Sequence, residues 1–223
     1  MRLAIFDLDH TLLAGDSDHL WGEFMIAQGL VEGDSYKRQN DRFYADYQAG
    51  TLDIAAYTRF ALEPLVRLGA EKLLPLRERF VAEVIDPIVA PAAPALLERH
   101  RIEGDELLII TATNRFVAEP IAQLLGVDQL LATDPERVNG RYTGAIAGIP
   151  CYREGKVRRL EQWVAEQGER PAHVTFYSDS HNDLPLLRQA QKPVAVDPDA
   201  ELGAEAARQG WLVISLREPP PSL

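Results

Sequence analysis

The chain has 223 residues, 46% hydrophobic and 26% charged, which suits one globular domain or a core with a smaller insertion and argues against wholesale disorder. Its 23 Lys and Arg against 34 Asp and Glu give a formal net charge of −11, which disfavours nucleic acid or an anionic membrane as the main partner. The single cysteine, Cys151, excludes an intrachain disulfide, and no apolar stretch approaches the roughly 20 residues of a membrane span. We therefore expect a cytoplasmic protein, and the sequence does not indicate an oligomeric state.

The chain opens on a predicted buried strand, an apolar run over residues 3–6 that ends at Asp7. Further apolar runs of strand length follow, and helical patterns separate most of them. The other predicted strands cover residues 107–111, 174–177, 193–196 and 211–214, and the predicted helices cover residues 117–125, 156–166, 184–190 and 200–209. Strands that alternate with helices predict an α/β fold with a Rossmann-like parallel sheet, covered by helices on both faces.

Two regions interrupt this alternation. Residues 17–85 carry amphipathic helical patterns without a convincing strand, and Thr51 is a plausible N-cap for one of these helices. Farther along, the pair Asn139-Gly140 is typical of a tight hairpin because both residues tolerate positive φ. We therefore predict a core formed by residues 1–15 and 86–223, with a small β-hairpin near residues 130–147, and a helical cap formed by residues 16–85.

Asp7 and Asp9 lie where the first strand ends, in the stretch Asp7-Leu8-Asp9-His10-Thr11. Ligands of open α/β sheets gather outside the carboxyl ends of the strands. One carboxylate there can attack phosphorus while the other handles the proton of the leaving group. Both need a cation nearby, and Mg²⁺ suits carboxylate and phosphate oxygens. Taken alone, the same pattern also describes a polar turn after a buried strand.

A hydroxyl and a lysine follow at later boundaries of predicted elements. Thr111 ends the second predicted strand, where it can bind a phosphate oxygen, although Thr is also common at strand ends. Lys156 opens a predicted helix, where its charge opposes the helix macrodipole. Neutralising a phosphate is one reason for that placement, and an ordinary exposed lysine is the other.

More carboxylates follow the strand predicted over residues 174–177, in Ser178-Asp179-Ser180-His181-Asn182-Asp183. One such residue is enough to cap the next helix, and Asn182 or Asp183 can do so. The excess of acidic groups indicates metal binding. Separate explanations for all four groups of residues are improbable together, so we expect one site.

These residues, taken in order, resemble the motifs of the haloacid dehalogenase-like phosphohydrolases. The family pattern is D-x-D-x-[TV], a strand-ending Ser or Thr, a Lys, and a D-x-x-x-D cluster. It is matched by Asp7 to Thr11, Thr111, Lys156, and Asp179 with Asp183. The resemblance covers nearly the whole chain, and the helical insertion looks like the cap of the phosphoserine phosphatase-like branch.

The resemblance implies a role for each matching residue. Asp7 is expected to form an aspartyl-phosphate, and Asp9 to protonate the leaving oxygen and then activate water. The expected phosphate-binding residues are Thr111, Ala112, Lys156 and Asn182, and the expected Mg²⁺ ligands are Asp7, Asp9, Asp179 and Asp183. His10 stands where the family has Gly or Ser, and we interpret it as a local structural choice.

The residues after the first motif bear on the substrate, which we expect to be a small phosphate ester. Asp16 lies where phosphoserine phosphatases carry a Glu that binds the substrate ammonium, and it is equally well placed to cap the first cap helix. Those enzymes also use a cap Arg for the substrate carboxylate. Arg67 lies at about that distance, but its surroundings match poorly.

The stretch from Leu13 to Asp18, with Trp21-Gly22 following, looks closer to a sister group, some of whose members dephosphorylate L-histidinol phosphate in amino-acid biosynthesis. That substrate has an amine and an imidazole but no carboxylate, so Asp16, Asp18 and Glu23 are its expected partners. The alternatives are phosphoserine phosphatase, a broad-specificity phosphatase or phosphotransferase, and a non-catalytic binding protein. The last of these predicts loss of motif residues, and all of them are present.

Overall fold

The computed structural model describes residues 1–218, so the last five residues of the predicted core lie outside the described part. Strands and helices alternate along most of the chain. The strands are β1 (Arg2–Phe6), β2 (Glu106–Asn114), β3 (Gln129–Thr133), β4 (Pro135–Val138), β5 (Arg141–Ile146), β6 (His173–Ser178), β7 (Lys192–Val196) and β8 (Leu212–Ile214). The α-helices are α1 (Ser17–Ala27), α2 (Gly33–Gln48), α3 (Ile54–Leu68), α4 (Ala70–Phe80), α5 (Ala93–Ile102), α6 (Arg115–Leu124), α7 (Glu154–Gln167), α8 (Leu184–Leu187) and α9 (Ala200–Gln209).

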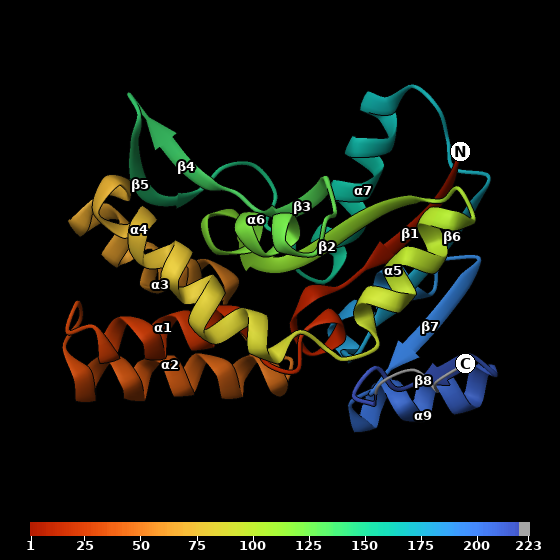
Figure 1. Cartoon of the computed structure of the whole chain (residues 1–223), viewed down its shortest axis with the longest axis horizontal. Helices are drawn as coiled ribbons and strands as arrows, with labels where there is room; N and C mark the ends of the chain where they lie inside the picture. Colours follow the sequence, from red (N-terminus) through yellow and green to blue (C-terminus); the bar gives the residue numbers. More distant parts are fainter. Residues whose placement is uncertain (219–223) are drawn as a thin grey trace.

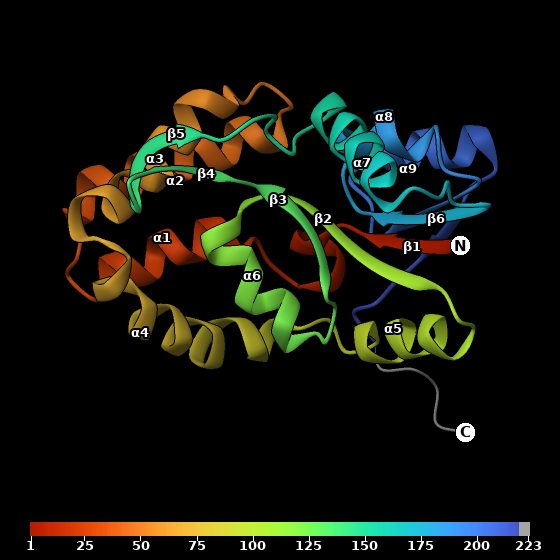
Figure 2. The ribbon, with the colours of Figure 1, turned by 90° about the horizontal axis from the view of Figure 1, so that it is seen from above.

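The main sheet is six-stranded and parallel, in the order β3-β2-β1-β6-β7-β8. Its faces are covered by α5 and α6 on one side and by α7, α8 and α9 on the other (Figure 2). The alternation of side chains along β1 supplies both layers, since Ala4 and Phe6 enter one hydrophobic cluster and Leu3 and Ile5 enter the other. The predicted α/β fold is confirmed.

The chain leaves β1 in one direction toward β2 and β3, and β6 to β8 continue on the other side of β1. The order in which the chain adds strands to the sheet therefore reverses between β1 and β6. A ligand crevice is expected outside the carboxyl ends of these two strands. The backbone N–H of Asp7 extends their pairing by donating to the carbonyl of Tyr177 at 2.9 Å. Asp7 is thereby fixed at the mouth of this crevice.

Helices α1 to α4, here called the helical segment, lie together beyond one end of the sheet (Figure 1). The β4–β5 hairpin packs on this segment, against α3. The predicted hairpin therefore began too early, because the apolar residues 129–133 form β3 at the edge of the main sheet. Its turn is as expected, with Asn139 at φ 51° and Gly140 at φ 78°.

Among the element boundaries that differ from the sequence prediction, three concern residues singled out there. The N-cap of α3 is Asp53, whose carboxylate accepts from the backbone N–H groups of Ala55 and Ala56, and not Thr51. Strand β2 runs three residues past Thr111, with an irregular register after Ile110. Lys156 is the third residue of α7, which begins at Glu154.

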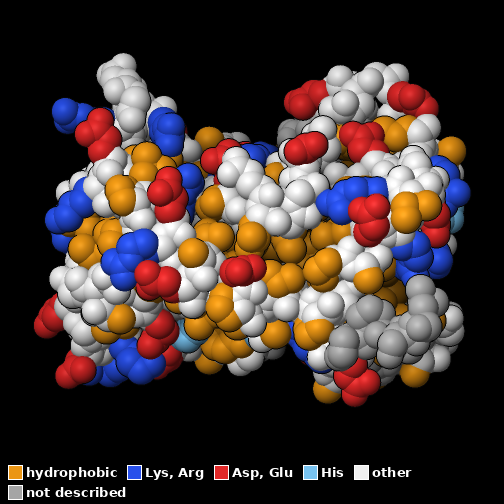
Figure 3. Space-filling view, viewed as in Figure 1, with side chains coloured by type: hydrophobic (Ala, Val, Ile, Leu, Met, Phe, Trp, Pro, Cys, Tyr) orange, Lys and Arg blue, Asp and Glu red, His pale blue; other side chains and the backbone are white. Residues whose placement is uncertain are grey.

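The surface carries charges of both signs. On the face shown in Figure 3, Lys and Arg side chains alternate with Asp and Glu over the helical segment, and hydrophobic side chains are visible across the middle of the face. Within residues 1–218, no helix combines the length and the apolar character that a membrane crossing requires.

Candidate active site

The residues matched by motif meet at the carboxyl end of the sheet. Lys156 Nζ donates to Asp7 Oδ1 at 2.9 Å and to Asp183 Oδ2 at 2.8 Å, and Ser178 Oγ donates to the same Asp183 oxygen at 2.8 Å. All four side chains are buried. Burial alone would lower the pKa of Lys156, but Asp183 and Asp7 hold that pKa above its ordinary value. Lys156 is therefore a buried cation between two carboxylates.

The carboxylates nevertheless outnumber the cation. Burial raises the pKa of Asp7 although Lys156 offsets part of the effect, and burial raises the pKa of Asp183 to about 6. Asp179 accepts from the Thr11 hydroxyl at 3.0 Å, and burial followed by the charges of Asp7 and Asp183 raises its pKa well above the ordinary value. Asp7 Oδ2 is buried without a hydrogen-bond partner among the described residues. A further positive charge would relieve this cluster.

The Asp9 carboxylate accepts hydrogen bonds from two elements, α1 and β2. Its Oδ1 accepts from the backbone N–H of Ser17 at 2.6 Å, and its Oδ2 accepts from the Thr113 hydroxyl at 2.6 Å. Burial, followed by the charge of Asp16, raises the pKa of Asp9 to about 6. A carboxyl group with such a pKa can hold and release a proton near neutral pH.

The loop that carries Asp9 turns sharply at His10, whose φ is 55°. This left-handed conformation is uncommon for residues other than glycine, although histidine adopts it more often than most. The turn is closed by the His10 N–H, which donates to the Gly15 carbonyl at 3.1 Å. His10 Nε2 lies 3.0 Å from the Tyr44 hydroxyl, so His10 also joins this loop to α2.

A narrow cavity of about 30 Å³ is lined by Asp7 and Asp9. Its walls come from the carboxyl edge of the sheet and from the helical segment. The lining residues are Asp7, Asp9, Asp16, Asp18, His19, Asn40, Phe43, Tyr44, Tyr47, Leu52, Ile54, Tyr57, Thr111, Ala112 and Thr113. Among these described residues there are four carboxylates and four aromatic rings of Phe and Tyr, and no Lys or Arg.

Thr111 and Ala112, which are expected to bind phosphate, line the cavity, although Thr111 does not end its strand. The buried Thr111 hydroxyl accepts from the backbone N–H of Thr113 at 3.1 Å. Thr113, which sequence reasoning did not select, donates to Asp9. Thr113 lies where the register of β2 with β3 becomes irregular. This irregularity is visible only in the structure, so the sequence could not have pointed to the Thr113 side chain.

Asp16 and Asp18 enter the cavity wall at the start of α1. Asp16 is the N-cap and accepts from the His19 N–H at 2.7 Å, and burial raises its pKa to about 6. Asp18 accepts from the side-chain amide of Asn114 at 2.7 Å, and burial raises its pKa well above the ordinary value. Asp16 thus caps α1, as one reading of the sequence expected, and it also lines the cavity, while its contact with a substrate stays a prediction.

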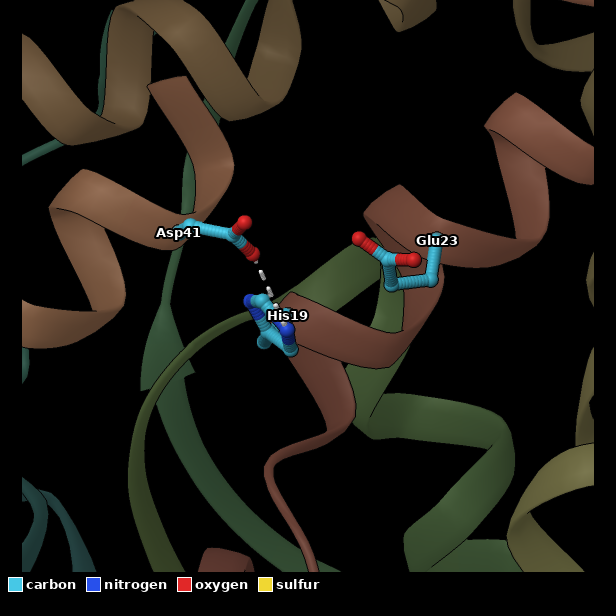
Figure 4. Close-up of side chains that lie close together, drawn as sticks. All are labelled: His19, Glu23 and Asp41. Carbon is cyan, nitrogen blue, oxygen red and sulfur yellow. Dashed lines mark ion pairs between the residues drawn. The ribbon is translucent and has the colours of Figure 1, made fainter. Parts of the chain in front are cut away.

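Glu23 is not among the cavity-lining residues. It lies one helical turn beyond His19 and accepts from Lys37 Nζ at 3.0 Å. Figure 4 shows Glu23 and His19 on α1 facing Asp41 on α2, and His19 Nε2 is 3.7 Å from Asp41 Oδ1. The ligand atoms of these three residues lie within 4.8 Å of one another, but Lys37 also pairs with Asp41 at 3.3 Å. A lysine between the two carboxylates already supplies the positive charge that a metal ion would bring.

A second cluster of similar size joins His100, Glu103 and Asp105. His100 lies between Asp105 Oδ2 at 2.7 Å and the Tyr177 hydroxyl at 2.8 Å, and Arg2 pairs with Asp105 at 2.7 Å. These partners already engage His100 and Asp105. The carboxylates of Asp7, Asp179 and Asp183 are less tightly grouped than either cluster, because Asp183 turns toward Lys156 and Ser178.

Asn182 joins the helical segment to the sheet edge and does not line the cavity. Its Nδ2 donates to the Tyr47 carbonyl at 3.0 Å, and its Oδ1 accepts from the Tyr152 hydroxyl at 3.1 Å. Arg153 donates to the Gly50 carbonyl at 3.1 Å close by. Both ends of the Asn182 amide therefore make contacts that close the site, and the phosphate contact expected from its motif stays a prediction.

Comparisons with known proteins agree with this arrangement. A family model for haloacid dehalogenase-like hydrolases matches residues 4–188. The chain is 47% identical over 220 residues to a histidinol-phosphatase of Neisseria meningitidis serogroup C, covering 97% of this chain and 99% of that protein. It is 30% identical to a phosphoserine phosphatase of Mycobacterium tuberculosis, covering 96% and 70%. A crystal structure of a protein of unknown function from Bordetella pertussis Tohama I is 42% identical, with a TM-score of 0.91 and coverage of 96% and 98%.

Proposed function

Because the chain belongs to the haloacid dehalogenase-like hydrolase family, we propose that it is a Mg²⁺-dependent phosphatase acting on a small, nitrogen-bearing phosphate ester, L-histidinol phosphate. The family assignment rests on the match over residues 4–188 and on the 47% identical histidinol-phosphatase. The buried cluster of Asp7, Lys156 and Asp183 supports the proposed chemistry. A cytoplasmic location stays a prediction from the sequence.

Asp7 is the proposed nucleophile. Lys156 holds Oδ1, and Oδ2 has no hydrogen-bond partner among the described residues. A carboxylate oxygen of Asp7 attacks phosphorus, the bond from phosphorus to the leaving oxygen breaks, and Asp9 transfers its proton to that oxygen. Water then attacks the phosphorus of the aspartyl-phosphate, Asp9 takes a proton from that water, and the bond from phosphorus to Asp7 breaks. The pKa of about 6 at Asp9 suits both transfers.

The carboxylates at the sheet edge fit a hard divalent cation. Asp7 and Asp183 are buried against a single lysine, the partly buried Asp179 lies close to both, and one oxygen of Asp7 has no partner among the described residues. Mg²⁺ usually keeps several waters and needs only one or two protein carboxylates, so the looser grouping of these residues is no obstacle. Asp7 and Asp179 are the proposed direct ligands, with Asp183 positioned by Lys156. When bound, Mg²⁺ supplies the positive charge that lets a phosphate dianion approach Asp7.

The composition of the cavity carries the substrate assignment. Asp16 and Asp18 line the cavity, whereas Lys156 does not, and Tyr44 and Tyr57 are among the aromatic rings that line it with them. Carboxylates attract an ammonium or imidazolium group, and aromatic faces suit a planar or cationic ring. L-Histidinol phosphate offers both kinds of group.

Phosphoserine fits this cavity less well. Its carboxylate would lie among carboxylates, and no Lys or Arg lines the described cavity. Arg67, the candidate partner from sequence, donates instead to Glu63 at 2.7 Å and to the Leu30 carbonyl at 3.0 Å, away from the cavity. Phosphoserine therefore remains the alternative substrate, supported by the 30% identical relative and opposed by this charge pattern.

Phosphate release from L-histidinol phosphate, L-phosphoserine and p-nitrophenyl phosphate tests the proposal. With Mg²⁺ we expect kcat/KM for L-histidinol phosphate to exceed that for phosphoserine by at least about 100-fold, because a misplaced charge is rejected strongly. Chelation of Mg²⁺ should abolish turnover of all three. Similar low turnover of every ester would overturn the substrate assignment while leaving the phosphatase assignment intact.

A further inference from the structure

Asn40 is an unusual residue for the helix that carries it. Of the 16 residues of α2, all of them described, Asn40 alone is buried. Its amide packs against Gly22 of α1, where an added Cβ would lie 2.6 Å from Asn40 Nδ2 and 2.9 Å from Oδ1. Burying an amide costs free energy unless its polar atoms find partners. The close approach at Gly22 therefore places Asn40 where those partners are available.

The orientation of the Asn40 amide follows from its partners. Nδ2 donates to the His19 carbonyl at 2.9 Å, and a carbonyl oxygen has no proton to give, so the atom facing it must be the nitrogen. The same Nδ2 lies 3.1 Å from His19 Nδ1, which therefore accepts. His19 then carries its proton on Nε2, which faces Asp41 as Figure 4 shows.

This arrangement leaves Asn40 Oδ1 as the atom to be satisfied. Asn40 lines the cavity together with Asp16 and Asp18. Among the described residues Oδ1 accepts no hydrogen bond. Oδ1 is also not fully buried, so a ligand or water can reach it. Asn40 thus adds an uncharged acceptor to a cavity that the carboxylates of Asp16 and Asp18 also line. Three acceptor side chains among the lining residues favour a ligand with N–H donors.

We propose that Asn40 Oδ1 accepts a hydrogen bond from an N–H group of the leaving group and so determines specificity, an inference that rests on the proposed function. The carboxylates of Asp16 and Asp18 attract positive charge, whereas the amide of Asn40 also binds a neutral imidazole N–H. Gly22 and His19 act as positioning residues, because they fix where the amide lies and which of its atoms is exposed.

The test compares substrates with and without an N–H donor. In Asn40→Ala, kcat/KM for L-histidinol phosphate should fall by about 10-fold or more, mainly through KM, because the lost hydrogen bond acts on bound substrate. For p-nitrophenyl phosphate, whose leaving group has no N–H, kcat/KM should change by less than about threefold. Asn40→Ser, which keeps a small polar group, should show the same selective loss if the alanine variant folds poorly. Gln39→Ala, at an exposed neighbour on α2, is the matched control and should leave both values unchanged.

Equal losses of kcat/KM on both substrates would mean that Asn40 has only a structural role and would overturn the inference. An unchanged KM for L-histidinol phosphate would overturn it as well. A wild-type enzyme that does not favour L-histidinol phosphate over phosphoserine would instead refute the proposed function. The two failures are therefore distinguishable.

Discussion

The two sides of the cavity are built on different principles. The floor, at the sheet edge, consists of Asp7 and Asp9, which line the cavity, and of Lys156, Asp179 and Asp183 beside them. The roof, from the helical segment, consists of His19, Asn40, Phe43, Tyr44, Tyr47 and Tyr57. In the floor, the buried Lys156 bonds two carboxylates at 2.8–2.9 Å. In the roof, aromatic rings lie among neutral polar groups. We expect bond breaking at the floor and choice of the leaving group at the roof.

The largest expected effect is in the floor, at the nucleophile. Asp7→Asn should lower kcat for every phosphate ester by at least about 1,000-fold, because an amide cannot form the covalent intermediate. The melting temperature should change little, since Lys156 keeps its bond to Asp183. Phosphate release and thermal unfolding check the two statements. Retention of even a tenth of wild-type activity would rule out covalent catalysis by Asp7.

A second substitution tests whether the floor depends on balanced charge. Lys156→Met keeps the volume but leaves Asp7 and Asp183 without a buried cation. The free energy of unfolding at pH 7 should fall by about 3–5 kcal/mol without Mg²⁺. Added Mg²⁺ should restore part of it, because the ion neutralises the same carboxylates. Urea unfolding with and without Mg²⁺ measures both effects.

The matched control is Lys37→Met, since Lys37 is half-exposed on α2 and also pairs with two carboxylates. This variant should change the free energy of unfolding little, and that free energy should not respond to Mg²⁺. Equal losses of unfolding free energy in the two variants would mean that Lys156 stabilises the fold no more than an exposed lysine does.

The floor could be predicted from the sequence, and most of the roof could not. Asp7, Lys156 and Asp179 follow strands or open a helix, so a correct ordering of elements brings them together at one sheet edge. Asn40 lies in a polar helix without any local signal, and its partner Gly22 acquires meaning only when α1 and α2 pack together.

Two expected site residues lie outside the cavity lining for the same physical reason. Glu23 was expected in the site because it follows Asp16 and Asp18 in sequence, but one helical turn carries it away to Lys37. Asn182 has the right motif position, yet its amide is taken by Tyr47 and Tyr152, contacts of long sequence separation. Chain order predicts which strand end a residue follows, but not which tertiary partner its side chain finds.

At Asp16, we expect a pH effect of intermediate size on the free energy of unfolding. Burial raises its pKa to about 6 in the folded state, against about 3.9 when unfolded. Protonation therefore stabilises the fold fully below about pH 4, and this stabilisation is lost as the pH rises to about 6. Between pH 7 and pH 5 the wild type should gain about 1 kcal/mol of stability relative to Asp16→Asn, which keeps the cap for the His19 N–H. Urea unfolding at both pH values without Mg²⁺ measures the difference, and parallel pH dependence in the two proteins would show that Asp16 is solvated like an ordinary carboxylate.

The smallest effect is expected at Arg67, and it bears directly on the absence of cations from the described roof. Arg67→Ala should change kcat/KM for L-histidinol phosphate and for phosphoserine by less than about twofold. The guanidinium is half-exposed and pairs with Glu63 in the same helix, an arrangement that contributes about 0–1 kcal/mol to stability. The control is Asp18→Asn, which alters a cavity carboxylate and should raise KM for L-histidinol phosphate. A loss of activity confined to phosphoserine in Arg67→Ala would mean that the arginine reaches the substrate carboxylate when the enzyme is occupied. The roof would then contribute a charge of its own, and its contrast with the floor would no longer hold.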